Sequence, residues 1–159
     1  METQTATMNQ KNQTPAQDAT ELLIADHKAV SGLFAEFEKT QSNAEKKRLV
    51  SKICKELTVH AQIEEEIFYP AVKIALKDKE LVPEARVEHQ VLKSLIEQVD
   101  GLEPDGEMFN AKIMVMYEYV KHHVKEEQEK MFPKAKATSL NMHELGGKLS
   151  DRKKALLAE

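Results

Sequence analysis

The stretch that decides the fold reads His60-Ala61-Gln62-Ile63-Glu64-Glu65 and closes on Phe68-Tyr69-Pro70. A second copy, further along the chain, reads His123-Val124-Lys125-Glu126-Glu127 and closes on Met131-Phe132-Pro133. In each copy the histidine lies four residues before a glutamate and ten residues before the proline. A further histidine precedes each copy, and these two, His27 and His89, are separated by almost the same interval as the copies themselves. The chain therefore contains an internal repeat in which histidine and glutamate stand one helical turn apart.

Apolar residues on either side of both signatures recur every three or four residues, which predicts four amphipathic helices. Asp18 and Glu21 resemble a capping box at the start of the first helix, and Pro83 suits the first turn of the third. We expect Pro70 to kink or end the second helix, because proline removes a helical hydrogen-bond donor and clashes one turn back. The predicted buried stripes are Leu23, His27, Val30, Phe34 and Phe37; Leu49, Ile53, His60, Glu64, Ile67 and Ala71; Ala85, His89, Leu92, Ile96 and Val99; and Phe109, Ile113, Met116, Val120, His123 and Glu127.

Four such helices joined by short links predict an all-α fold, an antiparallel up-down-up-down four-helix bundle with a pseudo-two-fold repeat. A last segment, roughly residues 140–157, predicts a short C-terminal helix docked on the outside of the bundle. The bundle domain then comprises residues 18–159. Residues 1–17 are mostly Thr, Gln, Asn and Ala, and we expect a disordered N-terminal tail there.

Composition excludes several classes of function. The formal net charge of −4 and the pI near 5.9 give no basic surface for nucleic acid or for a membrane. No apolar run approaches the length of a membrane span, and the first residues lack the apolar region of a secretory signal. Cys54 is the single cysteine, so we expect a small buried side chain in a reducing compartment. We therefore expect a cytoplasmic protein with neither a nucleic-acid nor a membrane partner, and the sequence identifies no protein partner.

The repeated histidines and glutamates predict a metal centre. His60 and Glu64 share one helix face, as do His123 and Glu127, and all lie on the predicted apolar stripes. A buried carboxylate without a partner is costly, so two of them in one core require cations. Imidazole nitrogen together with carboxylate oxygen suits iron, zinc or manganese rather than calcium. The predicted ligands of a pair of metal ions are His27, His60, Glu64, His89, His123 and Glu127.

The simpler alternative is that these are satisfied core histidines, or surface residues near helix ends. That interpretation suits any one histidine, but not four on buried stripes in a repeated context. Within the second copy, Glu127 is preferred over Glu126 because Ile63 occupies the matching place in the first copy. His123 is preferred over His122, which points about 100° away from the stripe. Four further residues are set aside: Glu65 and Glu66 as a solvated face, His143 as outside the repeat, and Tyr119 as either a core aromatic or a hydrogen-bond partner of a ligand.

A ferritin-like di-iron bundle would carry Glu-x-x-His pairs. The residues three before the histidines are instead Ile24, Leu57, Arg86 and Val120. The doubled His-x-x-x-Glu signature ending in Phe/Tyr-Pro resembles the hemerythrin-like (HHE cation-binding) domain family, over roughly residues 19–157. This resemblance implies a four-helix bundle around two non-haem iron ions with an oxo or hydroxo bridge, with zinc or manganese as alternatives. It also implies that Glu64 and Glu127 bridge both metals.

One position departs from the oxygen-carrying hemerythrins, which have His-x-x-x-His on the third helix. Here Lys93 stands four residues after His89, and a protonated lysine cannot bind iron. The resemblance is therefore to the bacterial type with four His and two Glu ligands. Counting two histidines, two bridging carboxylates and a bridging oxygen leaves one open position on each iron. Two open positions suit redox turnover better than reversible oxygen carriage.

The expected function is therefore that of a di-iron protein that binds or reacts with dioxygen, hydrogen peroxide or nitric oxide, in a redox or stress response, sensing or iron handling. Whether it is an enzyme, for example one that decomposes peroxide, stays open. One alternative is an iron-centre repair protein, a class that usually carries an additional cysteine-containing N-terminal domain. The other is a metal-stabilised helical interaction module without turnover, which the charged segment 151–154 favours, although a solvated helix face explains that segment as well.

Overall fold

The computed structural model describes residues 17–104 and 106–159, so all but the last residue of the predicted tail lies outside it. Within that part of the chain the structure is helical and contains no strand, which confirms the all-α prediction. The helices, with two π-helical turns η1 and η2, are α1 Ala19–Lys39, α2 Asn43–Ile63, η1 Glu64–Phe68, α3 Tyr69–Leu76, α4 Leu81–Val99, α5 Gly106–Glu126, η2 Glu127–Met131, α6 Phe132–Lys136 and α7 Met142–Leu157.

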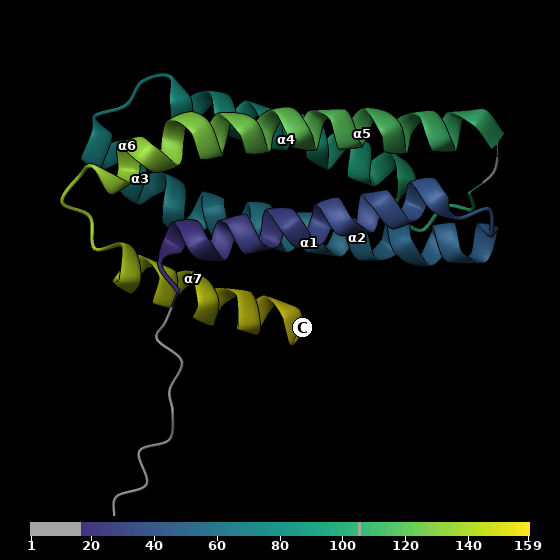
Figure 1. Ribbon diagram of the computed structural model, residues 1–159, viewed down its shortest axis with the longest axis horizontal. Helices are drawn as coiled ribbons and strands as arrows, with labels where there is room; N and C mark the ends of the chain where they lie inside the picture. Colours follow the sequence, from purple (N-terminus) through teal and green to yellow (C-terminus); the bar gives the residue numbers. More distant parts are fainter. Residues whose placement is uncertain (1–16, 105) are drawn as a thin grey trace, which may run out of the picture.

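Four long helices form the predicted up-down-up-down bundle. In Figure 1, α1 runs beside α2 and α4 runs beside α5, with all four axes roughly parallel. Contacts between α2 and α4 and between α1 and α5 join the two pairs into one bundle. The first pair and the second pair each carry one copy of the signature. None of the helices within the described residues combines the length and hydrophobicity that a bilayer crossing requires.

Local sequence explains where the long helices begin and end. The Asp18 carboxylate accepts a hydrogen bond from the backbone N–H of Glu21 at 3.0 Å, so Asp18 caps α1 as predicted. Ser42 caps α2 in the same way. Pro83 lies in the first turn of α4, where its missing N–H costs no helical hydrogen bond. After α4 ends, Gly101 has a positive φ, a backbone conformation that glycine adopts without strain.

Pro70 does not end its helix. The chain stays helical from Asn43 to Leu76, and a π-helical turn precedes the proline. The backbone N–H of Tyr69 bonds to the carbonyl of Glu64, five residues back, and Phe132 bonds to Glu127 in the same way before Pro133. The wider turn accommodates a residue that cannot donate to the usual carbonyl and would clash with it. Both π turns begin at the glutamate of the signature.

Two hydrophobic clusters fill the bundle interior, one on each side of the histidines. One of them, here named the apolar cluster, fills the end nearest the α1–α2 and α4–α5 links. It contains Cys54, and burial raises the pKa of the Cys54 thiol to about 12. The aromatic cluster fills the other end, where Phe68, Tyr69 and Phe132 pack with residues of α7. Of the predicted stripe residues, Ile67, Ala71 and Ile96 are only partly buried. The apolar cluster consists of Val30, Phe34, Phe37, Leu49, Val50, Ile53, Cys54, Leu57, Leu92, Val99, Phe109, Ile113, Met116 and Val120.

Helix α7 docks on the outside of α1 and α2, as predicted (Figure 1). A Cβ atom built on Gly146 would overlap the backbone oxygen of Gln17, so only glycine permits this close approach. The charged segment of α7 is not simply solvated: Arg152 bonds to the Glu66 carboxylate at 2.8 Å, and Lys153 bonds to the buried carboxylate of Asp26. The interpretation of this segment as a solvated face was therefore wrong for Lys153, whereas Arg152 pairs with Glu66 at the surface, where the two side chains are 37% and 39% exposed.

Candidate metal centre

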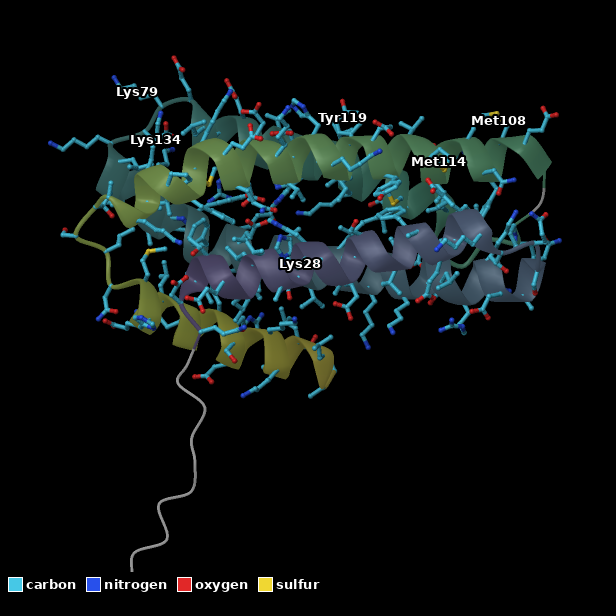
Figure 2. All side chains as sticks on the ribbon, in the orientation of Figure 1. Lys28, Lys79, Met108, Met114, Tyr119 and Lys134 are labelled. Carbon is cyan, nitrogen blue, oxygen red and sulfur yellow. The ribbon has the colours of Figure 1, made fainter. Side chains whose placement is uncertain are left out.

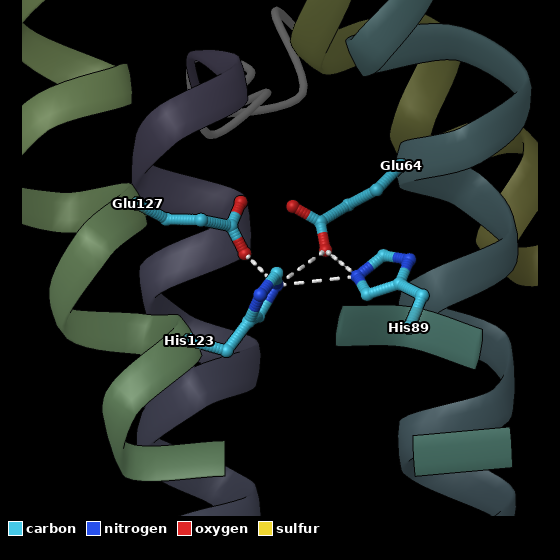
Figure 3. A group of neighbouring side chains, drawn as sticks. All are labelled: Glu64, His89, His123 and Glu127. Atoms are coloured by element: carbon cyan, nitrogen blue, oxygen red, sulfur yellow. Dashed lines mark hydrogen bonds and ion pairs between the residues drawn. The ribbon is translucent and has the colours of Figure 1, made fainter. Parts of the chain in front are cut away.

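All six predicted ligands meet inside the bundle. His27 comes from α1, His60 from α2, His89 from α4 and His123 from α5, and each is at most 7% exposed. Glu64 and Glu127, the first residues of the π turns, are 0% and 1% exposed. The helical spacing places each glutamate one turn beyond its histidine, on the inward face. Figure 3 shows Glu64 and Glu127 pointing toward each other, with the rings of His89 and His123 on one side of the two carboxylates.

The donor atoms form two groups that share a carboxylate. One group contains Glu64, His89, His123 and Glu127, and the other contains His27, His60 and Glu127. Oε1 of Glu64 lies 2.9 Å from Nε2 of His60 and 3.3 Å from Nε2 of His89, so this single oxygen faces both halves of the bundle. Oε1 of Glu127 lies 2.6 Å from Nε2 of His123 and 3.8 Å from Nε2 of His27. Both carboxylates therefore stand between the two histidine pairs.

The chemistry of these donors fits a pair of metal ions. Neither carboxylate oxygen of Glu64 or of Glu127 makes a hydrogen bond, although all four are buried. The Nε2 atoms of His27 and His60 are also buried without a hydrogen-bond partner. Buried polar atoms are ordinarily hydrogen-bonded, and a cluster of exceptions requires an explanation. Close donor atoms that are not aligned for hydrogen bonds have the arrangement expected around shared cations.

Electrostatics supports the same conclusion. Burial and the nearby carboxylate of Glu64 raise the pKa of Glu127 to about 7, because two adjacent carboxylates resist ionising together. Burial opposes protonation of His60, but the carboxylates of Glu64 and Asp26 outweigh it and raise the pKa of His60 to about 10. Burial lowers the pKa of His27 to about 4. A divalent or trivalent cation would stabilise both carboxylates as anions and displace the proton from His60.

The Nδ1 atom of each of the four clustered histidines faces a side chain that was not among the predicted site residues. Nδ1 of His60 bonds to Asp26 at 2.9 Å, and Nδ1 of His27 bonds to Gln128 at 3.1 Å. Nδ1 of His89 lies 3.5 Å from Glu65, and Nδ1 of His123 lies 3.6 Å from Glu88. Partners of this kind fix the ring orientation and the tautomer of a metal-binding histidine.

A repeat signal could have identified these four partners. Asp26 and Glu88 are the residues immediately before His27 and His89, so they occupy equivalent places in the two copies. Glu65 and Gln128 are the residues immediately after the two glutamates, and they are equivalent in the same way. The placement of Glu65 on a solvated face was therefore wrong: it faces His89 and bonds to Lys93 at 3.0 Å, and the histidine and the lysine lower its pKa to about 2.

The remaining neighbours lie largely where the sequence placed them. The side chain of Glu66 is 39% exposed and that of His122 is 65% exposed. Glu126 pairs with Lys130 at 2.9 Å rather than pointing inward. Lys93 is engaged by Glu65 and is not among the residues of either donor group. His143 is on α7, outside the site.

Tyr119 is neither a core aromatic nor a partner of the site. It lies on the outer side of α5 and is 38% exposed (Figure 2). The tyrosine in the centre is Tyr69, from the signature itself, which was not among the predicted site residues. Its hydroxyl lies 3.1 Å from Nε2 of His89 and 3.4 Å from Nε2 of His123. In a regular helix a residue five after Glu64 would point well away from it, and the π turn brings Tyr69 back toward that face.

Comparison with known proteins agrees with this geometry. The sequence model of the hemerythrin HHE cation-binding domain matches residues 18–135 of the chain. This chain belongs to the hemerythrin HHE cation-binding domain family. It is an HHE metal-binding domain with a histidine–glutamate cluster in its core. The matched residues include all six clustered side chains and end before α7.

Two relatives extend the comparison. A crystal structure of an HHE cation-binding domain-containing protein from Mycobacterium kansasii has the same fold, with a TM-score of 0.75 and 22% identity, covering 89% of this chain and 88% of that one. A protein of Nostoc sp. (strain PCC 7120) named DNA nickase is 28% identical over 112 residues. That match covers 70% of this chain but 32% of the relative, so the chain spans about a third of its length.

Proposed function

We propose that this chain is a non-haem di-iron protein that binds or reacts with dioxygen, hydrogen peroxide or nitric oxide. His27, His60, His89 and His123 would hold the two metals through Nε2, and Glu64 and Glu127 would bridge them. The observation that carries the proposal is the set of buried carboxylate and imidazole atoms that lack hydrogen bonds and lie between the two halves of the bundle. Imidazole with carboxylate suits iron, and also zinc or manganese.

The size of the interior supports a small inorganic ligand. An enclosed cavity of about 30 Å³ lies beside the centre and is lined by all four histidines and by apolar side chains that include Val30, Leu92 and Val120. This volume holds about two to three water-sized molecules. It suits a diatomic molecule or peroxide, and it is far below the roughly 300–1,000 Å³ of pockets that hold organic ligands.

The surrounding side chains supply binding and orientation. Bound iron would supply the electrons for a reaction with the small ligand. The Nδ1 atoms of the four imidazoles face Asp26, Gln128, Glu65 and Glu88. These neighbours orient the rings so that the Nε2 atoms stay directed inward. The apolar lining of the cavity limits access of bulk water to the centre. We propose that the centre has a redox or stress-linked role in the cytoplasm.

The interaction-module alternative has less support. Arg152 and Lys153, two of the charged residues on which it depends, are engaged by Glu66 and Asp26 of the same chain. The net charge of −4 also argues against a nucleic-acid partner, and we therefore do not extend the activity named for the Nostoc relative to this chain.

Elemental analysis with an absorption spectrum tests the proposal directly. We expect two irons per chain and a visible charge-transfer band, and we expect that band to change after hydrogen peroxide is added while peroxide is consumed. Zinc alone in the purified protein would contradict the proposal and favour the interaction module. Clean reversible spectra on mixing with dioxygen, without any consumption of peroxide, would contradict the redox role.

A further inference from the structure

The two halves of the centre differ although the repeat relates them. Tyr69 in the first signature corresponds to Phe132 in the second, since each directly precedes the proline. Tyr69 is 0% exposed, and its ring packs on His89 with centroids 5.2 Å apart. Phe132 stacks on His27 with centroids 6.0 Å apart. The repeat thus places one aromatic ring against a ligand histidine of each half, and only one of the two rings carries a hydroxyl group.

The Tyr69 hydroxyl stands among metal-binding atoms. It lies 3.1 Å from Nε2 of His89 and 3.4 Å from Nε2 of His123, and these two nitrogens are 3.2 Å apart. Donor atoms about 2.1 Å from one metal ion are separated by about 3.0 Å in octahedral and about 3.4 Å in tetrahedral coordination. The separations between these three atoms therefore match those between the ligands of a single metal ion.

We propose that the Tyr69 oxygen is a further ligand of the metal ion held by His89 and His123, which leaves the His27–His60 position as the one open to an exogenous ligand. This inference depends on the proposed di-iron function. A tyrosine oxygen is an established ligand of protein-bound iron. A hydroxyl with one hydrogen cannot donate to both imidazole nitrogens at once, whereas a shared cation satisfies all three atoms.

The side chains that face the Nδ1 atoms of the histidines also differ between the two halves of the centre. On the Tyr69 side, both outer partners are carboxylates, those of Glu65 and Glu88. On the other side the partner of His27 is the neutral amide of Gln128. A carboxylate makes a ligand imidazole more basic than an amide does. The metal on the Tyr69 side is therefore expected to be the more electron-rich of the two.

Access from solvent also differs between the halves. A surface pocket of about 310 Å³ between α1 and α5 is lined by His27, Gln128, Ser31 and Tyr117. His27 is 7% exposed, whereas His89 is 1% exposed. An exogenous ligand would thus approach the His27 side. With Tyr69 bound, the centre would have one open coordination position instead of the two counted from the four histidines and two glutamates. The number of open positions then no longer favours redox turnover over reversible oxygen carriage, and the peroxide and dioxygen experiments distinguish the two.

Spectroscopy of the iron-loaded protein tests this assignment. We expect resonance Raman spectra of the ferric protein to contain tyrosinate ring vibrations, which shift when the protein is labelled with ring-deuterated tyrosine. Tyr69→Phe should remove these vibrations and the corresponding visible band while two irons per chain remain. Tyr119→Phe is the matched control, because Tyr119 is on the surface, and it should change neither.

Azide titration provides a second readout. The ferric wild-type protein should bind one azide per centre, and the Tyr69→Phe variant should bind two. Two irons per chain with tyrosinate vibrations absent, or with vibrations that survive Tyr69→Phe, would overturn the inference and leave the proposed function intact. An absence of bound iron would contradict the proposed function and this inference together.

Discussion

The apolar cluster and the layer of histidines and glutamates beside it occupy neighbouring turns of the same four helices. In the apolar cluster, Phe34, Leu49 and Ile53 are at most 1% exposed and contribute through hydrophobic burial and close packing. In the adjacent layer, Glu64 and Glu127 are equally buried but lack hydrogen bonds. Apolar packing stabilises the first region, whereas burial of the two carboxylates in the second is costly unless a cation or another partner compensates it.

The difference extends to the surroundings of each region. The apolar cluster lies among regular α-helical turns. The π turns, Pro70 and Pro133, and the docked helix α7 all gather at the other end of the bundle. Irregular helical turns are common at functional sites, where they redirect side chains. Here they turn Tyr69 and Phe132 toward His89 and His27, which regular helices would not do.

The largest expected effect comes from removing one of the two carboxylates that we propose bridge the metals. Glu127→Ala should abolish binding of at least one metal ion. The free energy of unfolding of the metal-loaded protein should fall by about 4 kcal/mol, the stabilisation that a ligand provides at about a thousand times its dissociation constant. Elemental analysis and urea unfolding measure both quantities, and Glu64→Ala should behave alike. Glu126→Ala is the control, because Glu126 pairs with Lys130; an equal loss there would contradict the assignment.

A substitution that creates a cavity in the apolar cluster should lower the stability of the protein without changing its metal content. Ile53 is fully buried. Ile53→Ala should therefore cost about 2–5 kcal/mol of unfolding free energy. Because Ile53 is not among the clustered histidines and glutamates, metal content should stay at the wild-type value, and the cost in unfolding free energy should be similar with and without chelator. Urea unfolding under both conditions provides the measurement, and a loss of metal in this variant would show that the two regions are not separable.

Two adjacent glycines in α7 offer a matched pair. A methyl group at Gly146 would overlap the backbone of residues 17–19. Gly146→Ala should therefore displace the helix and cost about 1–3 kcal/mol. No atom within 4 Å meets a Cβ at Gly147. Gly147→Ala should be neutral, or stabilising by up to about 1 kcal/mol. Thermal unfolding of the metal-loaded proteins distinguishes the two, and equal melting temperatures would contradict the close packing of α7 on α1.

The smallest effect concerns the contact of α7 with the centre. Lys153 holds Asp26, which in turn holds Nδ1 of His60. Lys153→Met should cost about 1–2 kcal/mol of unfolding free energy and speed the loss of metal to a chelator, since His60 would be less firmly oriented. The control is Lys154→Met, at an exposed position of the same helix. This change should alter stability by less than about 0.5 kcal/mol. Identical rates of metal loss in both variants would argue against this connection.

The sequence predicted the helices, their order and the clustering of the six side chains correctly, because each depends on spacing along the chain. A helix with a 3.6-residue period places His60 above Glu64 without any knowledge of its neighbours. Asp18 and Pro83 mark helix ends for equally local reasons. Repetition of the pattern then predicted that two such units face each other.

Only the tertiary structure determined what surrounds those six residues. The approach of Lys153 to Asp26 spans 127 residues, and that of Gln128 to His27 spans 101. No periodicity along the chain encodes such pairs. The position of Tyr69 depends on a π turn, which a regular helical projection from the sequence omits. Local spacing fixes the direction of a side chain on its own helix, whereas its partners depend on how the helices pack together.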